Sequence, residues 1–77
     1  MKKFYVIRSK KESDRLDGII KANNIEEAHE EVKENLSSSL LEGEIFLIFE
    51  NLEPLSFERD GRVIVPSDKR VATIGRL

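Results

Sequence analysis

The sequence predicts an α+β protein in which one helix packs on a mostly antiparallel, twisted sheet, with the element order ββαβββ. Two observations predict this class. The runs 4–7 and 45–49 are rich in β-branched and aromatic residues, which are typical of strands. A single segment, 24–36, has apolar residues at helical spacing behind a capping pattern. A chain of 77 residues makes one small domain, 1–77.

Two strands joined by a charged loop are expected first. The first strand, 4–8, is apolar on both faces, because successive side chains of a strand point to opposite sides of the sheet. The charged segment 9–17 ends in Asp17-Gly18, a strong turn signal, and is interpreted as a long, mobile hairpin loop. Residues 18–23 form a second, weaker strand.

The helix is expected to begin after Asn24, whose side-chain oxygen can accept a hydrogen bond from a free backbone N–H. Glu27, three residues later, completes a capping box. Serines at 37–39 lower the helix propensity, so the helix should end near Leu36. The apolar face of this helix consists of Ile25, Ala28, Val32 and Leu36.

The second half of the chain predicts further strands. The run 45–49 is the third strand and, like the first, is apolar on both faces. A turn follows at 51–54, and Asp60-Gly61 predicts a tight hairpin between short apolar runs. Residues 69–74 form either a last edge strand or a short helix, and the pattern favours the strand.

General connection rules select one arrangement of the first three strands. The first two strands pair antiparallel, and the helix returns the chain across one face by a right-handed crossover. The third strand then runs parallel to the second and antiparallel to the first. This gives the order 2-1-3, with the C-terminal hairpin either extending the sheet or folding back over it.

The face of the sheet away from the helix needs a second cover. Four large apolar side chains left in water there would forgo about 6–12 kcal/mol of burial, which is comparable to the whole stability of a small domain. A second copy of the chain, the chain beyond Pro54, or a different protein could supply the cover. A homodimer is the first expectation.

The expected function is therefore that of a small non-enzymatic protein–protein interaction module. It would bind an unidentified protein partner through an apolar sheet face and a charged rim. From the size and charge of the chain, we expect a phage- or plasmid-type regulator or inhibitor of a host protein. The candidate partner-binding residues are Tyr5, Ile7, Phe46 and Ile48 in the sheet and Glu27, Glu30, Glu31 and Glu34 on the helix.

Nucleic-acid binding is the alternative function. The net charge of −2 conceals a basic segment, 1–21, with seven basic and three acidic residues, followed by a strongly acidic segment, 22–53. Basic residues beside aromatic ones on a β-strand are typical of proteins that bind single-stranded nucleic acids. The acidic helix would repel phosphates, which makes this the second choice. The candidate residues are Lys2, Lys3, Arg8, Lys10, Lys11 and Arg15.

No motif in the sequence indicates catalysis or a cofactor. The chain has no cysteine, which excludes a disulfide and a thiolate metal site. The one histidine, His29, lies at the edge of the apolar face of the acidic helix, and the sequence places no complete set of metal ligands beside it. The four glycines are scattered and form no phosphate-binding loop. We expect neither an enzyme nor a metal or cofactor site.

The sequence also bears on location. The basic start is followed by only the short apolar run 4–7 before Arg8, which is too short for the apolar region of a signal peptide. No apolar segment approaches the roughly 20 residues of a membrane span. We expect a cytoplasmic protein that does not contact membranes.

The stretch from Ile20 to Ala28, a strand followed by a capped Glu-Glu-Ala helix, is similar to antitoxin domains of the HicB type and to short accessory proteins of phages and plasmids. The glycine- and proline-containing segment that HicB-type domains carry before this helix is absent here. No residue role follows from the resemblance.

Overall fold

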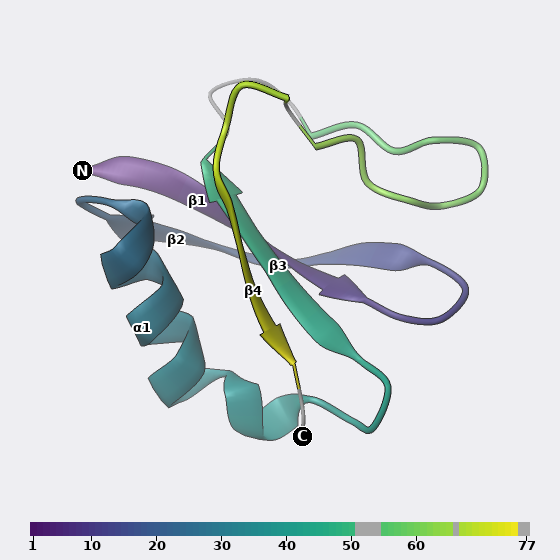
Figure 1. Cartoon of the computed structure of the whole chain (residues 1–77), viewed down its shortest axis with the longest axis horizontal. Coiled ribbons are helices and arrows are strands. Elements are labelled where there is room, and N and C mark those ends of the chain that lie inside the picture. The colour runs from purple at the N-terminus through teal and green to yellow at the C-terminus, as the bar shows by residue number, and fades with distance from the viewer. Residues whose placement is uncertain (51–54, 66, 76–77) are drawn as a thin grey trace.

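The computed structural model describes residues 1–50, 55–65 and 67–75 and shows an α+β fold (Figure 1). One helix packs on a four-stranded sheet with the order β2-β1-β3-β4, in which all neighbouring strands are antiparallel. The elements are β1 (Lys2–Ser9), β2 (Asp14–Ala22), α1 (Ile25–Asn35), the short 3₁₀ helix η1 (Ser37–Ser39), β3 (Ile45–Glu50) and β4 (Val71–Gly75). The predicted fold class and the 2-1-3 order of the first strands are confirmed.

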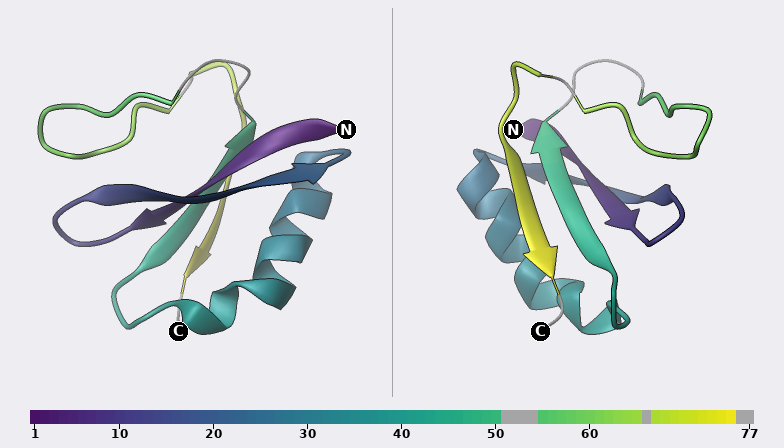
Figure 2. Two further views of the ribbon diagram at one scale, coloured as in Figure 1. Left: turned by 180° about the vertical axis from the view of Figure 1, so that it is seen from behind. Right: turned by 45° about the vertical axis from the view of Figure 1, so that its right-hand side comes forward.

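The strands β1 and β3 form the centre of the sheet because both of their faces are apolar. Val6 pairs with Ile48 on the side of α1, and Tyr5 pairs with Phe49 on the opposite side. A strand with two apolar faces is stable only where both faces are covered. The helix α1 connects β2 to β3 across β1 and lies on one side of the twisted sheet (Figure 2).

The helix begins and ends close to where the sequence predicts. Asn24 is the N-cap in an extended conformation, and its Oδ1 accepts a hydrogen bond from the backbone N–H of Glu27 at 2.8 Å. At the other end, the N–H of Leu36 donates to the carbonyl oxygen of Val32 at 2.8 Å. The predicted N-cap at Asn24 and the predicted end near Leu36 are confirmed, whereas the Glu27 carboxylate accepts a hydrogen bond from Nδ2 of Asn23 at 3.2 Å.

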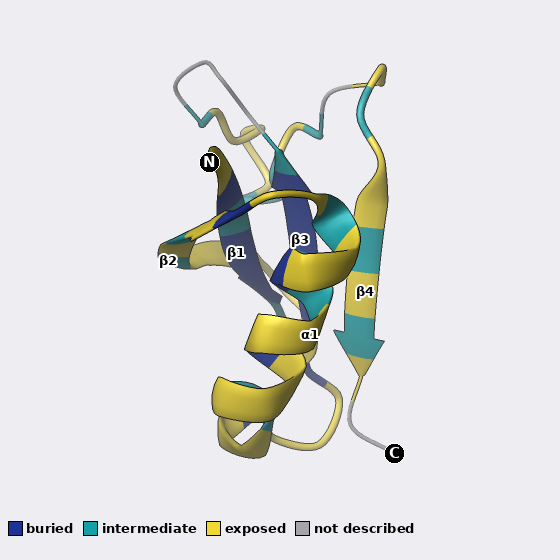
Figure 3. Cartoon of the chain, turned by 90° about the vertical axis from the view of Figure 1, so that its left-hand side faces the viewer, coloured by how far each residue is buried: buried dark blue, intermediate teal, exposed yellow. Residues whose placement is uncertain are grey.

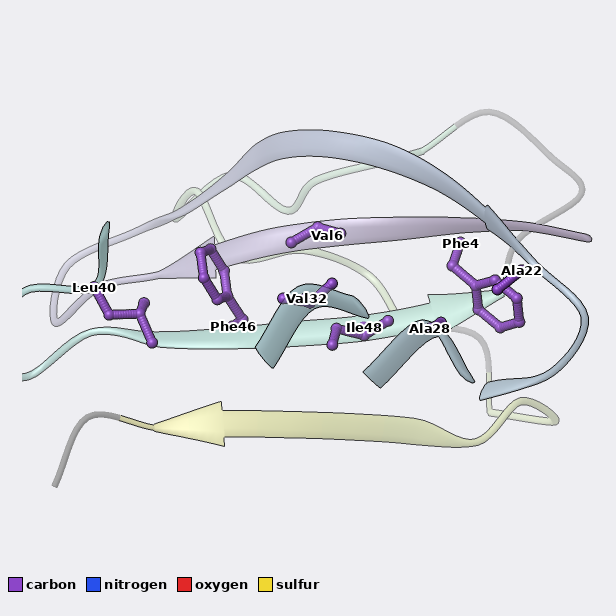
Figure 4. Packing of buried hydrophobic residues seen from close by; sticks show 8 residues of the cluster. All are labelled: Phe4, Val6, Ala22, Ala28, Val32, Leu40, Phe46 and Ile48. Atoms are coloured by element: carbon purple, nitrogen blue, oxygen red, sulfur yellow. The ribbon is translucent and has the colours of Figure 1, made fainter. Parts of the chain in front are cut away.

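The core lies between α1 and the sheet (Figure 4). The helix contributes Ala28 and Val32, whose small side chains allow it to lie close to the strands. Half-buried apolar residues at the edges of the helix and on β4 surround this centre. The buried members of the core are Phe4, Val6, Ala22, Ala28, Val32, Leu40, Phe46 and Ile48.

The first hairpin differs from the prediction. Its loop consists of residues 10–13 and is closed by a hydrogen bond of 2.8 Å from the N–H of Lys10 to the carbonyl oxygen of Ser13. The strand β2 already begins at Asp14. The expected long, mobile loop over 9–17 is therefore wrong.

The Asp17-Gly18 signal marks a bulge and not a turn. Both residues lie inside β2, where its register with β1 shifts between Val6 and Ile7. A bulge inserts an extra residue into one strand and turns its side chains. The Asp17 carboxylate there accepts a hydrogen bond from Arg8 at 3.0 Å, so tertiary pairing outweighs the local turn preference.

Residues 55–65 form a projecting hairpin, called the C-terminal arm below (Figure 1). The predicted turn at Asp60-Gly61 is confirmed, since Gly61 has a φ of +86° and its N–H donates to the carbonyl oxygen of Glu58 at 3.0 Å. A single bridge joins Phe57 to Val63, so the arm does not extend the main sheet.

The last described element is a strand. The strand β4 covers Val71–Gly75 and pairs with β3. The strand interpretation of 69–74 is therefore confirmed over the helix interpretation. The turn expected at 51–54 lies outside the described residues.

Candidate functional site

The strand register assigns the side chains of the sheet to two faces. Tyr5 pairs with Ile19 and Phe49, and Phe49 pairs with Val71, so these four residues form one row on the face opposite α1. We call this the outer face. By the same register, it carries Tyr5, Ile7, Leu16, Ile19, Ile45, Leu47, Phe49, Val71 and Thr73.

The centre of the outer face is closed. Ile7 and Phe49 have no exposed surface, although neither belongs to the core cluster beneath α1. The C-terminal arm and α1 lie on opposite sides of the sheet (Figure 1). Ile7 and Phe49 are therefore enclosed within a single chain, without a second copy.

Asp14 at the start of β2 holds the arm. Its Oδ2 accepts a hydrogen bond from the N–H of Val63 at 2.9 Å, and its Oδ1 accepts one from Nη1 of Arg62 at 2.9 Å. The N–H of Asp14 donates to the carbonyl oxygen of Gly61 at 2.9 Å. Arg62 also donates to the carbonyl oxygen of Lys10 at 2.7 Å. These bonds fix the arm to the tip of the β1–β2 hairpin.

The ionised state of the Asp14 carboxyl supports this attachment. Burial acts to raise the pKa of the Asp14 carboxyl, but hydrogen bonds from the Ser9 hydroxyl, the Val63 N–H and Arg62 outweigh it. The pKa of Asp14 is therefore lowered from its ordinary value. The carboxylate stays ionised, which is the form that accepts all three hydrogen bonds.

The margin of the outer face remains exposed. On β2, Leu16 and Ile19 have 39% and 53% of their surface exposed, and Ile45 on β3 and Val71 on β4 have 37% and 39%. Figure 3 shows the same contrast, with buried residues concentrated in β1 and β3 and exposed ones alternating along β4. This exposed margin is the candidate functional site.

The predicted sheet residues do not form one surface. Tyr5 and Ile7 lie on the outer face, where Tyr5 is half-buried with its ring centroid 6.1 Å from that of Phe49. Phe46 and Ile48 lie on the opposite face beneath α1, where neither has exposed surface. Their assignment to a partner-binding surface is corrected, since the pleat of β3 turns them into the core.

The predicted acidic residues lie on the other side of the molecule. Glu27, Glu30, Glu31 and Glu34 are exposed on α1. The sheet separates them from the outer face, so the eight predicted partner-binding residues are distributed over separate surfaces. The acidic stripe and the apolar margin would have to contact a partner from opposite sides.

Arg8 is a structural residue and does not belong to a basic surface. Its Nη1 lies 2.9 Å from Oε1 of Glu44, and its Nη2 lies 3.0 Å from Oδ2 of Asp17. It also donates to the carbonyl oxygen of Ser39 at 3.0 Å, and its guanidinium lies 5.1 Å from the ring centroid of Phe46. Only 9% of its surface is exposed, so its assignment to nucleic-acid binding is corrected.

The charges in this cluster stabilise one another. The hydrogen bond to Asp17 is the main reason why the pKa of Arg8 is raised, and burial partly opposes it. The Arg8 guanidinium in turn lowers the pKa of Asp17. The pKa of Glu44 is lowered first by the hydrogen bond from the N–H of Leu41 and then by Arg8. The cluster joins β1, β2 and the loop before β3.

Three of the remaining basic residues of the first segment are paired with acidic side chains. Lys2 lies 3.7 Å from Glu50, Lys10 lies 3.6 Å from Glu44, and Arg15 lies 3.3 Å from Asp17. Lys3 and Lys11 are exposed and make no ion pair within the described ranges. This arrangement weakens the case for nucleic-acid binding.

The described residues contain no arrangement that indicates a metal centre. His29 is half-buried on α1, and no group of three His, Asp or Glu side chains among the described residues is placed to hold a metal ion. Over the same part of the chain, no helix combines the length and hydrophobicity of a transmembrane span.

Comparison with other proteins does not identify a relative. No protein-family model, curated protein or solved structure matches this chain.

The attachment between Asp14 and Arg62 was missed by sequence reasoning. The two residues are 48 positions apart, and no local pattern links them. The exposed margin could have been found by extending the strand alternation from Tyr5 through Phe49 to Val71. That inference needs the register, which a single sequence does not provide.

Proposed function

We propose that the protein is a small non-enzymatic interaction module that binds another protein through the exposed margin of its outer face. The observation that supports this proposal is the exposure of Leu16, Ile19, Ile45 and Val71 on one sheet surface whose centre is apolar and closed. Exposed apolar patches with a polar surround are typical of protein interaction sites.

The closed centre of the outer face limits the strength expected of this interaction. Because Ile7 and Phe49 are already covered, a partner gains only the remaining exposure of the marginal side chains. Burying a half-exposed aliphatic side chain contributes about 1 kcal/mol. The proposed interaction is therefore of moderate affinity.

A second copy of the chain is the first partner to test. A protein that the module regulates or inhibits is the second, in line with the regulatory role expected from the sequence. In both cases, the binding surface is the same margin, so the same variants test both.

The experiment compares Ile19→Lys and Ile45→Lys with the wild type by sedimentation velocity over a range of protein concentrations. Leu41→Lys is the matched control, because Leu41 has 63% of its surface exposed but lies outside the sheet. We expect the margin variants to weaken self-association and the control to leave it unchanged.

If the wild type is monomeric, the same variants are used in affinity capture from lysate of the source cell. A stoichiometric partner should be retained by the wild type and Leu41→Lys and lost by the margin variants. Equal behaviour of all variants in both experiments would contradict the proposal. Salt-dependent binding of labelled single- or double-stranded oligonucleotides would instead support the alternative function.

A further inference from the structure

The two edge strands of the sheet differ in their protection against pairing. The strand β2 carries Asp14, Arg15, Asp17 and Lys21, and a bulge interrupts its register. Charges and bulges are the usual devices that keep a strand edge from pairing with another chain. The strand β4 has the sequence VATIG with neither charge nor register shift, and no described strand lies on its outer side.

A groove lies between this unprotected edge and α1, which pack against each other. A depression of about 360 Å³ is lined by Ile25, His29 and Glu30 of α1 and by Val71 and Ala72 of β4. Side chains of successive strand residues point to opposite faces, so a groove that includes both Val71 and Ala72 reaches around the strand edge. A second depression of about 270 Å³ adjoins it and also includes Ile25 and Arg70.

The helix side of the groove is acidic. Glu26 and Glu30 are both exposed there. Glu26 lies 2.8 Å from Arg70, whereas Glu30 makes no ion pair with a described residue. A cation brought into the groove would therefore have a free carboxylate to bind.

We infer that β4 is a docking edge for an extended segment of a partner protein whose basic side chains face α1. The segment adds to the sheet through backbone hydrogen bonds, which is a recurring mode of peptide recognition. Its lysine or arginine stems lie on Ile25 and Ala72 while their charges reach Glu30. Its apolar side chains, on the alternate positions, lie beside Val71 on the outer face.

Charge selects this occupant over a second copy of the chain. Symmetric pairing of two β4 edges would place both α1 helices on the same face of one continuous sheet. Each helix carries five glutamates and one lysine between Ile25 and Asn35. The Glu30 carboxylate, which has no ion-pair partner among the described residues, would then lie on the same side of the junction as that of the other copy, so like-charge repulsion opposes this dimer.

The test uses a short capped peptide in which valine and lysine alternate. It is titrated into isotope-labelled full-length protein, and backbone amide shifts are followed by NMR. We expect shifts at Val71–Gly75 and not along β2. A peptide with glutamate in place of lysine, and a lysine peptide with N-methylated backbone, should bind at least about tenfold more weakly.

Variants on α1 test the charge contribution. Glu30→Lys should weaken peptide binding about fivefold to tenfold at low salt, and Glu31→Lys, which makes the same charge change outside the groove, should leave it nearly unchanged. The Ile19→Lys variant, at the opposite edge of the sheet, should bind the peptide like the wild type. Loss of the outer-face function would therefore leave this result intact.

Several results would overturn the inference. These are the absence of shifts at β4 up to about 1 mM peptide, equal binding of the glutamate peptide, or equal effects of Glu30→Lys and Glu31→Lys. Shifts at β4 that depend on protein concentration without any peptide would assign the edge to a second copy instead.

Discussion

Arg8 shows how a single charged residue can be placed in a largely apolar sheet. It occupies the face of β1 toward α1, where the preceding residues on that face, Phe4 and Val6, belong to the core. Its guanidinium is satisfied by Asp17 and Glu44, and among the described residues no buried side-chain nitrogen or oxygen lacks a hydrogen-bond partner. A buried cation without such partners would be strongly unfavourable.

Replacing Arg8 with methionine tests this interpretation. We expect Arg8→Met to lower the free energy of unfolding at pH 7 by about 2 kcal/mol, because Asp17 loses its main charged hydrogen-bond donor. Urea unfolding monitored by circular dichroism measures the change. Lys11→Met is the control, since Lys11 is exposed and makes no ion pair with a described residue.

Measuring the stability difference between wild type and Arg8→Met at low pH tests whether it has an ionic origin. The pKa values of Asp17 and Glu44 are lowered in the folded protein, so their contribution is present above their unfolded pKa values and lost as the pH falls through the folded ones. The difference between wild type and Arg8→Met should therefore shrink below about pH 4. A difference that stays constant down to pH 2 would contradict an ionic origin.

At the scale of elements, α1 depends on a local feature that can be recognised in the sequence, namely its N-cap and acidic first turn. Asn24 accepts the N–H of Glu27, and the first turn carries Glu26 and Glu27 at the positive end of the helix dipole. The other elements depend more on their neighbours. The strand β2 extends back to Asp14 because of pairing with β1 and contacts with the arm, although its own residues resemble a loop.

The N-cap of α1, Asn24, can be tested by substitution. Asn24→Ala should lower the free energy of unfolding by about 1 kcal/mol, because the N–H of Glu27 loses its acceptor. Asn23→Ala is the matched control, since the Asn23 side chain makes only an exposed bond of 3.2 Å to the Glu27 carboxylate. Thermal and urea unfolding would measure both variants, and equal losses would argue against a capping role for Asn24.

At the scale of the whole molecule, the arm, which is far along the chain, is bonded to the tip of the β1–β2 hairpin. The arm is attached by Asp14 and Arg62, and the centre of the outer face is closed. Ile7 and Phe49 are enclosed within one chain and do not need a second copy to cover them. The exposed margin and the β4 edge are what remain for partners. They share Val71, but Ile19 belongs only to the margin and Glu30 only to the groove beside β4, so separate variants can test them.

The attachment of the arm to Asp14 through Arg62 can be tested by substitution. Arg62→Met should increase the exchange rate of the Val63 and Gly61 amide protons at least about tenfold, since the arm loses its charged contact with Asp14 and opens locally. Arg59→Met, in the same arm, is the control because no described ion pair involves Arg59. Hydrogen exchange followed by NMR gives both rates, and unchanged protection of Val63 in Arg62→Met would show that other contacts hold the arm.

The sequence by itself determined the features that depend on near neighbours. These are the capped helix after Asn24, the apolar strands β1 and β3, the turn at Asp60-Gly61 and, through general connection rules, the 2-1-3 order. Only the tertiary structure decided which face each strand residue occupies, that Asp17-Gly18 forms a bulge, and that Ile7 and Phe49 are enclosed on the outer face. The reason is physical: capping and turns are bonds between residues a few positions apart, whereas register, burial and the ion pairs of Arg8 and Arg62 join residues far apart in the chain, and only their relative position in space fixes them.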